Sequence, residues 1–282
     1  MKTGLVLEGG GVCGIYTAGI LDVFMEEGIT FDNIIGVSAG AIHAVSYLSG
    51  QKGRSIRYYK NYCDDYRFMS FKSFIKTGDV VGVDFCYHEL PEKLDIFDNE
   101  TFKKNTVPFY VVCSNLETGC AEYIRINDAN AQIDFIRASA SLPYFSRIVE
   151  IGGKKYLDGG CTDSIPLNAS QDMGFKKNVV ILTRDIGYRK RSEMPLLTKL
   201  LYRKYPRFKQ ALLHRHEMYN EQAKQVLEEE KNGNVFVFRP ETPLEVSRME
   251  TDAKKIQLAY ERGRNQALEN IEKLKQWLKE TD

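Results

Sequence analysis

In the N-terminal part of the chain, short apolar runs alternate with segments whose apolar residues recur at helical spacing. Residues 3–8 and 33–37 are runs of strand length. Residues 15–27 and 41–48 follow them with the pattern of helices that bury one face. A strand–helix–strand order produces parallel strands whose connecting helices cover the sheet. We therefore expect a three-layer α/β fold, with a mainly parallel central sheet and helices on both faces.

The rest of the chain adds strands first and helices later. Residues 53–105 are aromatic and charged without a clean period, and we expect helices and loops that cover a site. We predict a helix at 129–140, helices up to about 231 and a long helix from 249 to the end. Strands are predicted at 109–113, 120–124, 147–151, 154–157, 178–183 and 235–238, the first four as two hairpins. We divide the chain into a core at 1–185 and a mostly helical C-terminal extension at 186–282, packed on it.

Composition narrows the class of protein. Apolar residues make up 43% of the chain and charged residues 27%, as in ordinary globular proteins. The net charge of +1 argues against a nucleic-acid partner. No apolar run is long enough to span a membrane, and Glu8 interrupts the N-terminal run, unlike in a signal peptide. The six cysteines and four histidines show no metal-ligand spacing. We expect a cytoplasmic protein with free thiols, no metal and no cofactor; the oligomeric state stays open.

One apolar run ends in a serine between two glycines, Gly36-Val37-Ser38-Ala39-Gly40. A sharp turn from strand to helix places its central side chain at the tip, and only small residues fit at Gly36 and Gly40. Ser38 would stand above a helix N-terminus, where backbone N–H groups favour negative charge. This position suits a nucleophile, but the pentapeptide alone is common. A serine nucleophile also requires a base and donors for an oxyanion.

Three consecutive glycines, Gly9, Gly10 and Gly11, follow the first predicted strand and could supply those donors. Glycines expose their N–H groups and adopt the conformations of anion-binding loops. A dinucleotide loop is a second interpretation, because Gly9-x-Gly11-x-x-Gly14 follows a strand. That loop requires an acidic residue at the end of the next strand, whereas Asp32 precedes it. We therefore favour an oxyanion hole.

No histidine is an evident base. A Ser-His-Asp hydrolase of this kind would carry a histidine late in the chain. His214 and His216 are the only late ones, and both fall in a basic helical segment. His43 follows Ser38 on its own helix and should point away from it, and His88 lies in the aromatic region. A surface or packing role is the better interpretation of each.

A carboxylate is the remaining candidate for the base. Asp158 ends a predicted strand and is followed by Gly159 and Gly160, which could turn the carboxylate into a pocket. Taken alone, this is an ordinary Asp-Gly turn. The residues by themselves leave the identity of the base open.

Four motifs in register give the chain a family resemblance. They are Gly9-Gly10-Gly11-Val12-Cys13-Gly14, Gly36-Val37-Ser38-Ala39-Gly40, Arg137-Ala138-Ser139-Ala140-Ser141-Leu142-Pro143-Tyr144-Phe145 and Asp158-Gly159-Gly160. Together, over about residues 3–185, they resemble the patatin-like phospholipase family in its bacterial form. The segment that starts at Arg239-Pro240 is similar to the tail of one bacterial branch of that family.

The resemblance implies a patatin-like catalytic core and a Ser-Asp dyad without histidine. Ser38 would be the nucleophile, Asp158 the proton acceptor, and the amides of Gly9–Gly11 the oxyanion hole. The implied partner is a lipid ester, hydrolysed through an acyl-enzyme as by a phospholipase A or lysophospholipase. A Ser-His-Asp esterase and a non-catalytic lipid- or nucleotide-binding module are the alternatives.

Cys13 departs from the family pattern, which usually has Arg or Lys at this position. The missing cation bears on phospholipid preference more than on ester hydrolysis itself. A buried packing role is the common one for a free cysteine.

Two stretches admit a lipid-related interpretation and a plain one. Residues 184–215 carry ten Lys and Arg against two acidic residues and could contact a membrane surface transiently. We favour a solvated helix pair whose leucines pack inward, namely Leu196, Leu197, Leu200 and Leu201. For the aromatic residues of 58–87 we likewise favour core and lid packing over a lipid channel.

Overall fold

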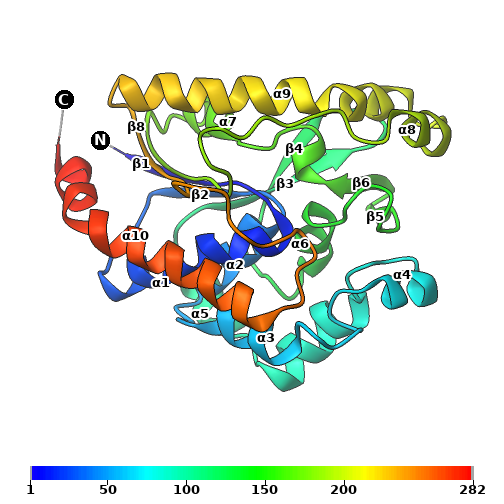
Figure 1. Ribbon diagram of the computed structural model, residues 1–282, viewed down its shortest axis with the longest axis horizontal. Coiled ribbons are helices and arrows are strands. Elements are labelled where there is room, and N and C mark those ends of the chain that lie inside the picture. The colour runs from blue at the N-terminus through cyan, green and yellow to red at the C-terminus, as the bar shows by residue number, and fades with distance from the viewer. Residues whose placement is uncertain (1, 281–282) are drawn as a thin grey trace.

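The computed structural model describes residues 2–280, and it confirms an α/β fold with helices on both faces of a central sheet (Figure 1). Within these residues the sheet has eight strands in the order β5-β6-β3-β2-β1-β7-β8, with β4 paired to β3 outside this path. The strands are β1 (Thr3–Leu7), β2 (Asn33–Gly36), β3 (Phe109–Asn115), β4 (Ala121–Arg125), β5 (Val149–Ile151), β6 (Lys154–Asp158), β7 (Lys177–Ile181) and β8 (Val235–Phe238).

The sheet is parallel at its centre and antiparallel at one side. Parallel pairing runs from β3 through β2, β1 and β7 to β8. In β1, Leu5 and Leu7 pack into the core on one face and Val6 into the core on the other. Because successive side chains point to opposite faces and both faces are covered, such a strand is apolar throughout.

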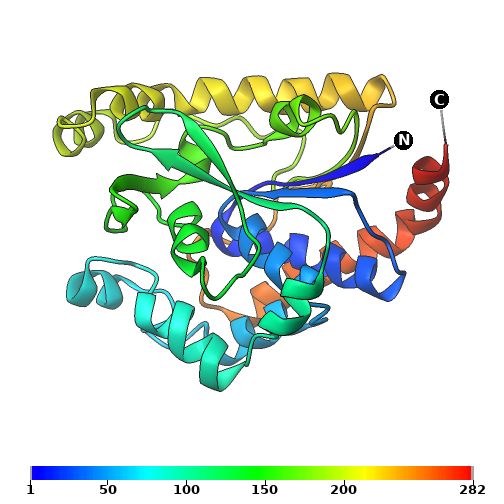
Figure 2. The same ribbon diagram turned by 180° about the vertical axis from the view of Figure 1, so that it is seen from behind.

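Helices cover the two faces unequally (Figures 1 and 2). The upper face in Figure 1 carries α7 (Leu167–Asp172) and α9 (Pro206–Lys231). The lower face carries α1 (Ile15–Glu26), α2 (Ala39–Leu48) and α6 (Ile133–Ser139). The remaining helices are α3 (Arg54–Tyr62), α4 (Phe71–Thr77), the π-helix η2 (Phe85–Leu94), α5 (Asn99–Lys104), α8 (Pro195–Leu201) and α10 (Ala253–Lys279).

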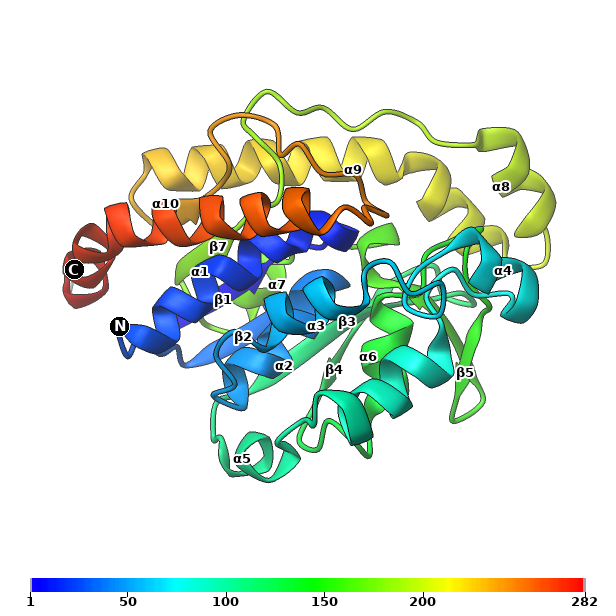
Figure 3. The same cartoon turned by 60° about the horizontal axis from the view of Figure 1, so that its bottom comes forward.

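The C-terminal part joins the same fold. Its strand β8 pairs in parallel with β7, and α10 lies along α1 (Figure 3). None of the helices within residues 2–280 combines the length and apolar character needed to cross a membrane.

Two predicted features differ from the structure. The helix predicted at 129–140 begins only at Ile133, because Asp128 accepts a hydrogen bond of 3.0 Å from the N–H of Ala131 and holds a turn there. The inward packing predicted for the leucines of 184–215 is wrong for most of them, since Leu196 is 80% exposed and Leu200 63%. The short helix α8 instead buries Thr198.

Candidate active site

Ser38 sits at a strained turn between β2 and α2. Its backbone angles are φ 53° and ψ −121°, a region that non-glycine residues rarely occupy. The turn folds back so tightly that a methyl group at Gly36 would lie 2.6 Å from the Cα of Ala41. At Gly40 it would lie 2.6 Å from the carbonyl oxygen of Glu8. Both predicted motif glycines are therefore required by space.

A side chain from the motif at 137–145 supports this turn. The backbone N–H of Ser38 donates a hydrogen bond of 3.0 Å to Oγ of Ser139, which is fully buried. Ser139 ends α6 and belongs to the motif that the sequence singled out without giving it a role. The hydrogen bond fixes the orientation of the Ser38 peptide group.

Sheet topology brings Asp158 to Ser38. Strand β3 pairs first in parallel with β2 and then antiparallel with β6, so that Gly36 faces Val111 and Asp158 faces Cys113. Since β2 and β6 approach from opposite directions, their carboxyl ends meet beside the same stretch of β3. A polar cavity here is lined by Ser38 and Asp158 together with Gly9, Gly10 and Gly11.

Asp158 is held by the two glycines that follow it. Its side chain is buried, with 2% of the residue exposed, and Oδ1 accepts a hydrogen bond of 2.8 Å from the N–H of Gly160. A methyl group at Gly159 would lie 2.1 Å from the carbonyl oxygen of Val112, so only glycine fits against β3. Within residues 2–280, no direct hydrogen bond joins the Asp158 carboxylate to the Ser38 hydroxyl.

The glycine loop borders Ser38 directly. A methyl group at Gly9 would lie 3.0 Å from Cβ of Ser38, and one at Gly10 would lie 2.7 Å from Oγ1 of Thr183. Gly11 has φ 59°, which favours glycine. Gly14 allows the loop to reach α2, since a methyl group there would lie 2.6 Å from Cβ of Ala39.

Glu8, which the sequence reasoning treated only as an interruption of the first strand, anchors the base of this loop. Its carboxylate is buried and accepts hydrogen bonds from the N–H of Thr183 at 2.6 Å and from the hydroxyl of Tyr219 at 2.8 Å. Burial raises the pKa of this carboxyl group, and the hydrogen bond from Thr183 acts against that shift. In the sequence, the sign of this anchoring role was the position of an acidic residue at the end of an apolar strand.

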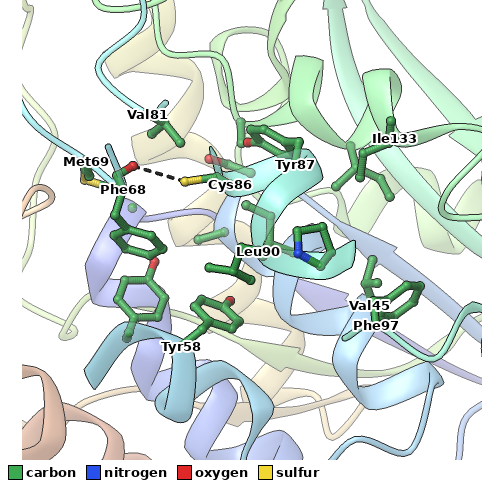
Figure 4. A pocket seen from close by; sticks show the side chains of 18 of the residues that line it. Val45, Tyr58, Phe68, Met69, Val81, Cys86, Tyr87, Leu90, Phe97 and Ile133 are labelled. Carbon is green, nitrogen blue, oxygen red and sulfur yellow. Dashed lines mark hydrogen bonds between the residues drawn. The ribbon is translucent and has the colours of Figure 1, made fainter. Parts of the chain in front are cut away.

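A second cavity opens at Ser38, and its walls are mostly apolar (Figure 4). It encloses about 1050 Å³, open space at its mouth included, and Ser38, Gly11, Leu142 and Arg248 line both this apolar cavity and the polar one. About half of its lining residues lie within 54–97, among them Tyr58, Tyr59, Phe68, Tyr87 and Phe97. The aromatic stretch therefore lines a cavity beside the serine, in addition to the packing that we predicted for it.

Among the described residues, no histidine lines either of these two cavities. His43 is buried in α2, where its Nδ1 is 2.9 Å from Oγ of Ser55, and burial lowers its pKa to about 3. His214 is half exposed beside Glu217, and His88 is exposed beside Glu92. His216 lines a further cavity, which neither Ser38 nor Asp158 lines. The positions of the four histidines do not support a Ser-His-Asp arrangement.

Cys13 occupies a packing position. It is fully buried, and its Sγ donates a hydrogen bond of 3.4 Å to the carbonyl oxygen of Val246. The neighbouring N–H of Val12 donates one of 3.1 Å to the carbonyl oxygen of Arg248. The segment at 246–248 is thus fastened to the glycine loop.

Sequence comparison decides the family. The profile described as patatin-like phospholipase matches residues 5–169, more than half of the chain. The chain belongs to the patatin-like phospholipase family. Residues 205–279 match a second profile, described as a domain of unknown function, DUF6363.

Alignments with known relatives cover about two thirds of this patatin-like protein and a smaller share of each relative. The uncharacterized protein YjjU of Escherichia coli K12 is 32% identical over 192 residues, which are 64% of this chain and 52% of YjjU. Lysophospholipase NTE1 of Kluyveromyces lactis is 27% identical over 190 residues, 65% of this chain and 12% of that protein. The crystal structure of VipD from Legionella pneumophila has a TM-score of 0.46 at 14% identity and covers 96% of this chain and 67% of VipD. The matches span about half of YjjU and a small part of the yeast protein.

The patatin-like match ends before several residues that line the polar cavity beside Ser38. Six of them lie beyond residue 169, namely Arg184, Tyr188, Lys190, Arg215, Tyr219 and Arg248. Sequence reasoning noticed the basic character of 184–215 but could not place it beside the serine.

Proposed function

We propose that this patatin-like protein hydrolyses carboxylic esters of lipids, as a phospholipase A or lysophospholipase does. One observation carries the proposal: Ser38 lies where a large apolar cavity meets a polar cavity that contains Asp158 and the glycine loop. An acyl chain fits the first cavity, and the reacting carbonyl group then lies at the second.

Each proposed role follows from position and chemistry. Ser38 attacks the ester carbonyl carbon, and Asp158 accepts the proton of its hydroxyl group. The N–H groups of Gly9–Gly11 stabilise the oxyanion that forms. Collapse of this intermediate expels the alcohol, which takes up the proton from Asp158, and leaves an acyl-enzyme. Asp158 then activates a water molecule that hydrolyses the acyl-enzyme and restores Ser38.

The dyad requires the Ser38 hydroxyl and the Asp158 carboxylate to come within hydrogen-bond distance when substrate binds. The Asp158 carboxylate has one oxygen engaged by Gly160, so its other oxygen is available for Ser38. Catalytic hydrogen bonds are often longer before substrate binds. The strained backbone of Ser38 supports this role, because such strain is commonly concentrated at functional sites.

Activity of two variants tests the dyad. Ser38→Ala and Asp158→Asn should each remove nearly all hydrolysis of a short-chain p-nitrophenyl ester while leaving the circular dichroism spectrum unchanged. A fluorophosphonate probe should label the wild-type protein at Ser38, as located by peptide mass spectrometry. Normal turnover by either variant would contradict the dyad. An inactive wild type that binds a lipid or nucleotide would favour the non-catalytic alternative.

The exposed end formed by α4 and α8 is the surface that we propose for transient contact with a lipid aggregate (Figures 1 and 3). Phe71 is 66% exposed and Ile75 72%, and α8 adds Leu196 and Leu200. Basic residues flank them, which suits an anionic lipid surface. They are Lys72, Lys76, Lys199, Arg203 and Lys204.

Aromatic contacts connect this exposed end to the site. Phe74 of α4 packs on Phe145 with ring centroids 6.3 Å apart, and Tyr144 packs on Tyr202 at 5.9 Å, directly after α8. The segment that includes Tyr144 and Phe145 lines a third, outer cavity next to the polar one. Substrate taken from a lipid surface would thus arrive close to Ser38.

Vesicle sedimentation tests this surface. The doubly substituted Leu196→Ser/Leu200→Ser protein should bind phosphatidylglycerol-containing vesicles less than wild type does. Leu258→Ser is the matched control, because Leu258 is 60% exposed on α10. Equal binding by all three proteins would refute the assignment of α8.

We also propose a cytoplasmic location. The six cysteines are free in the structure, which supports a reducing compartment.

A further inference from the structure

Four cationic side chains line the polar cavity beside Ser38: Arg184, Lys190, Arg215 and Arg248. Of the carboxylates in the described part of the chain, two line the same cavity, those of Glu8 and Asp158. The Glu8 carboxylate is already engaged by Thr183 and Tyr219. The cavity therefore has an excess of positive charge at the place where the reacting ester would lie.

The protein itself leaves much of this charge unneutralised. Nε of Arg215 donates to the carbonyl oxygen of Gly160 at 2.6 Å, so its partner carries no charge. Lys190 and Arg248 share one carboxylate, with Oε1 of Glu193 3.7 Å from Nζ of Lys190 and 3.4 Å from Nη1 of Arg248. Within residues 2–280, no carboxylate forms an ion pair with Arg184 or Arg215.

The excess of positive charge affects Lys190. The residue is only 5% exposed, and burial lowers the pKa of its ammonium group to about 8, to which repulsion from Arg215 and Arg248 contributes. A buried cation that is repelled by its neighbours gains most from a bound anion.

The cations lie on the alcohol side of the proposed substrate. If the acyl chain occupies the apolar cavity and the carbonyl oxygen faces the glycine loop, the alcohol points into the polar cavity. Lys190, Arg215 and Arg248 also line the outer cavity, which encloses about 910 Å³, open space included. These three basic residues therefore line both of the cavities into which the alcohol part of the ester can extend.

We propose that Lys190, Arg215 and Arg248 form a subsite for a phosphate monoester on the alcohol side of the scissile ester. This inference rests on the proposed function and adds the choice of headgroup to it. Guanidinium groups suit phosphate because they donate parallel hydrogen bonds to two of its oxygens. A phosphocholine group is disfavoured, since its quaternary ammonium would be brought among three cations.

Three soluble esters test this choice of headgroup. They are 1-hexanoylglycerol 3-phosphate, its phosphocholine counterpart and 1-hexanoylglycerol, which share the acyl chain and the glycerol. Each is used below its aggregation concentration, so that attraction to a charged surface does not contribute. We expect kcat/KM for the phosphate monoester to exceed that for the other two by about tenfold or more, the usual worth of a charge-assisted hydrogen bond.

Variants assign the preference to residues. Arg248→Gln and Lys190→Gln should each lower the ratio of kcat/KM for the phosphate monoester to kcat/KM for 1-hexanoylglycerol about tenfold. Arg189→Gln is the control, because Arg189 is exposed in the same basic segment and does not line the cavity. Glycerol 3-phosphate and inorganic phosphate, tested as competitive inhibitors, distinguish a headgroup subsite from one for free phosphate.

The outcomes separate this inference from the proposed function. Hydrolysis of all three esters at equal rates, or equal losses on all three in Arg248→Gln, would overturn the subsite and leave the esterase intact. Stronger inhibition by inorganic phosphate than by glycerol 3-phosphate would also overturn it. Absence of hydrolysis of every ester, including the p-nitrophenyl ester, would refute the proposed function itself.

Discussion

The Cα of Gly263 in α10 lies against the carbonyl oxygen of Tyr16 in α1, so that a methyl group at Gly263 would come within 2.1 Å of that oxygen. The contact is reciprocal, since a methyl group at Gly19 would lie 2.2 Å from the carbonyl oxygen of Tyr260. Two glycines thus allow the backbones of the first and last helices to touch. Neither backbone can yield as a flexible side chain could.

Replacement of Gly263 by Ala should destabilise the protein. The clash with backbone should cost about 1–3 kcal/mol or more, against a gain in helix propensity of about 1 kcal/mol. Urea unfolding measures the difference as a lower midpoint. Glu269→Ala, at an exposed position of the same helix, is the control. A midpoint for Gly263→Ala at or above the wild-type value would show that α1 and α10 are not packed this closely.

Loss of the Ser139 hydroxyl should slow the reaction without unfolding the protein. Ser139→Ala removes the acceptor for the buried N–H of Ser38 and frees the turn that presents the nucleophile. An unsatisfied buried donor costs about 1–3 kcal/mol. We expect kcat to fall about tenfold or more with KM little changed, and slower labelling of Ser38 by a fluorophosphonate. A variant with wild-type kcat would show that this hydrogen bond has no positioning role.

Acid should destabilise the protein through His43. Its pKa is about 3 in the folded state against 6.5 ordinarily, so only the unfolded chain takes up the proton between these values. Stability from this group is complete above pH 6.5 and is lost as the pH falls towards 3, by about 2–3 kcal/mol at pH 4.5. His43→Gln should lose this part of the pH dependence in urea unfolding. Identical pH profiles for the two proteins would mean that His43 is protonated in the fold.

The proposed phosphate subsite should weaken in alkali. Lys190, with a pKa of about 8, faces Arg215, Arg248 and Glu193 and lies over the ring of Tyr219. It is protonated below pH 8 and neutral above, so attraction for an anion is lost as the pH rises through 8. KM for the phosphate monoester should therefore rise between pH 7 and 9. Lys190→Arg should remove the rise, because arginine stays charged. A pH-independent KM in the wild type would contradict a role for Lys190.

The sequence predicted the centre of the fold because its signals there are local. Strands β1, β2 and β7 are buried on both faces, so each is an apolar run that can be recognised without knowledge of its neighbours. The tight turn at Ser38 can likewise be predicted from Gly36 and Gly40. Glycine is required at both positions, because a side chain there would clash with residues a few positions away or on the adjacent strand.

What the sequence could not show depends on long-range pairing. Asp158 reaches the polar cavity only because β3 pairs with both β2 and β6, and no local pattern reveals that register. The leucines of α8 have the spacing of a packed helix, yet Leu196 and Leu200 are exposed. The helix is short and has few contacts with α9, so it does not bury them. Lys190 and Arg248 are adjacent in space but 58 positions apart in the sequence.

The backbone of Arg248 makes a contact that does not depend on its side chain. Its carbonyl oxygen accepts a hydrogen bond from the N–H of Val12 beside the glycine loop, and the residue lines all three cavities. A carbonyl oxygen is present in every amino acid, so the closure does not depend on which residue stands at 248. A substitution at position 248 therefore keeps this hydrogen bond, so that the charge beside Ser38 can change while the loop next to the nucleophile stays closed.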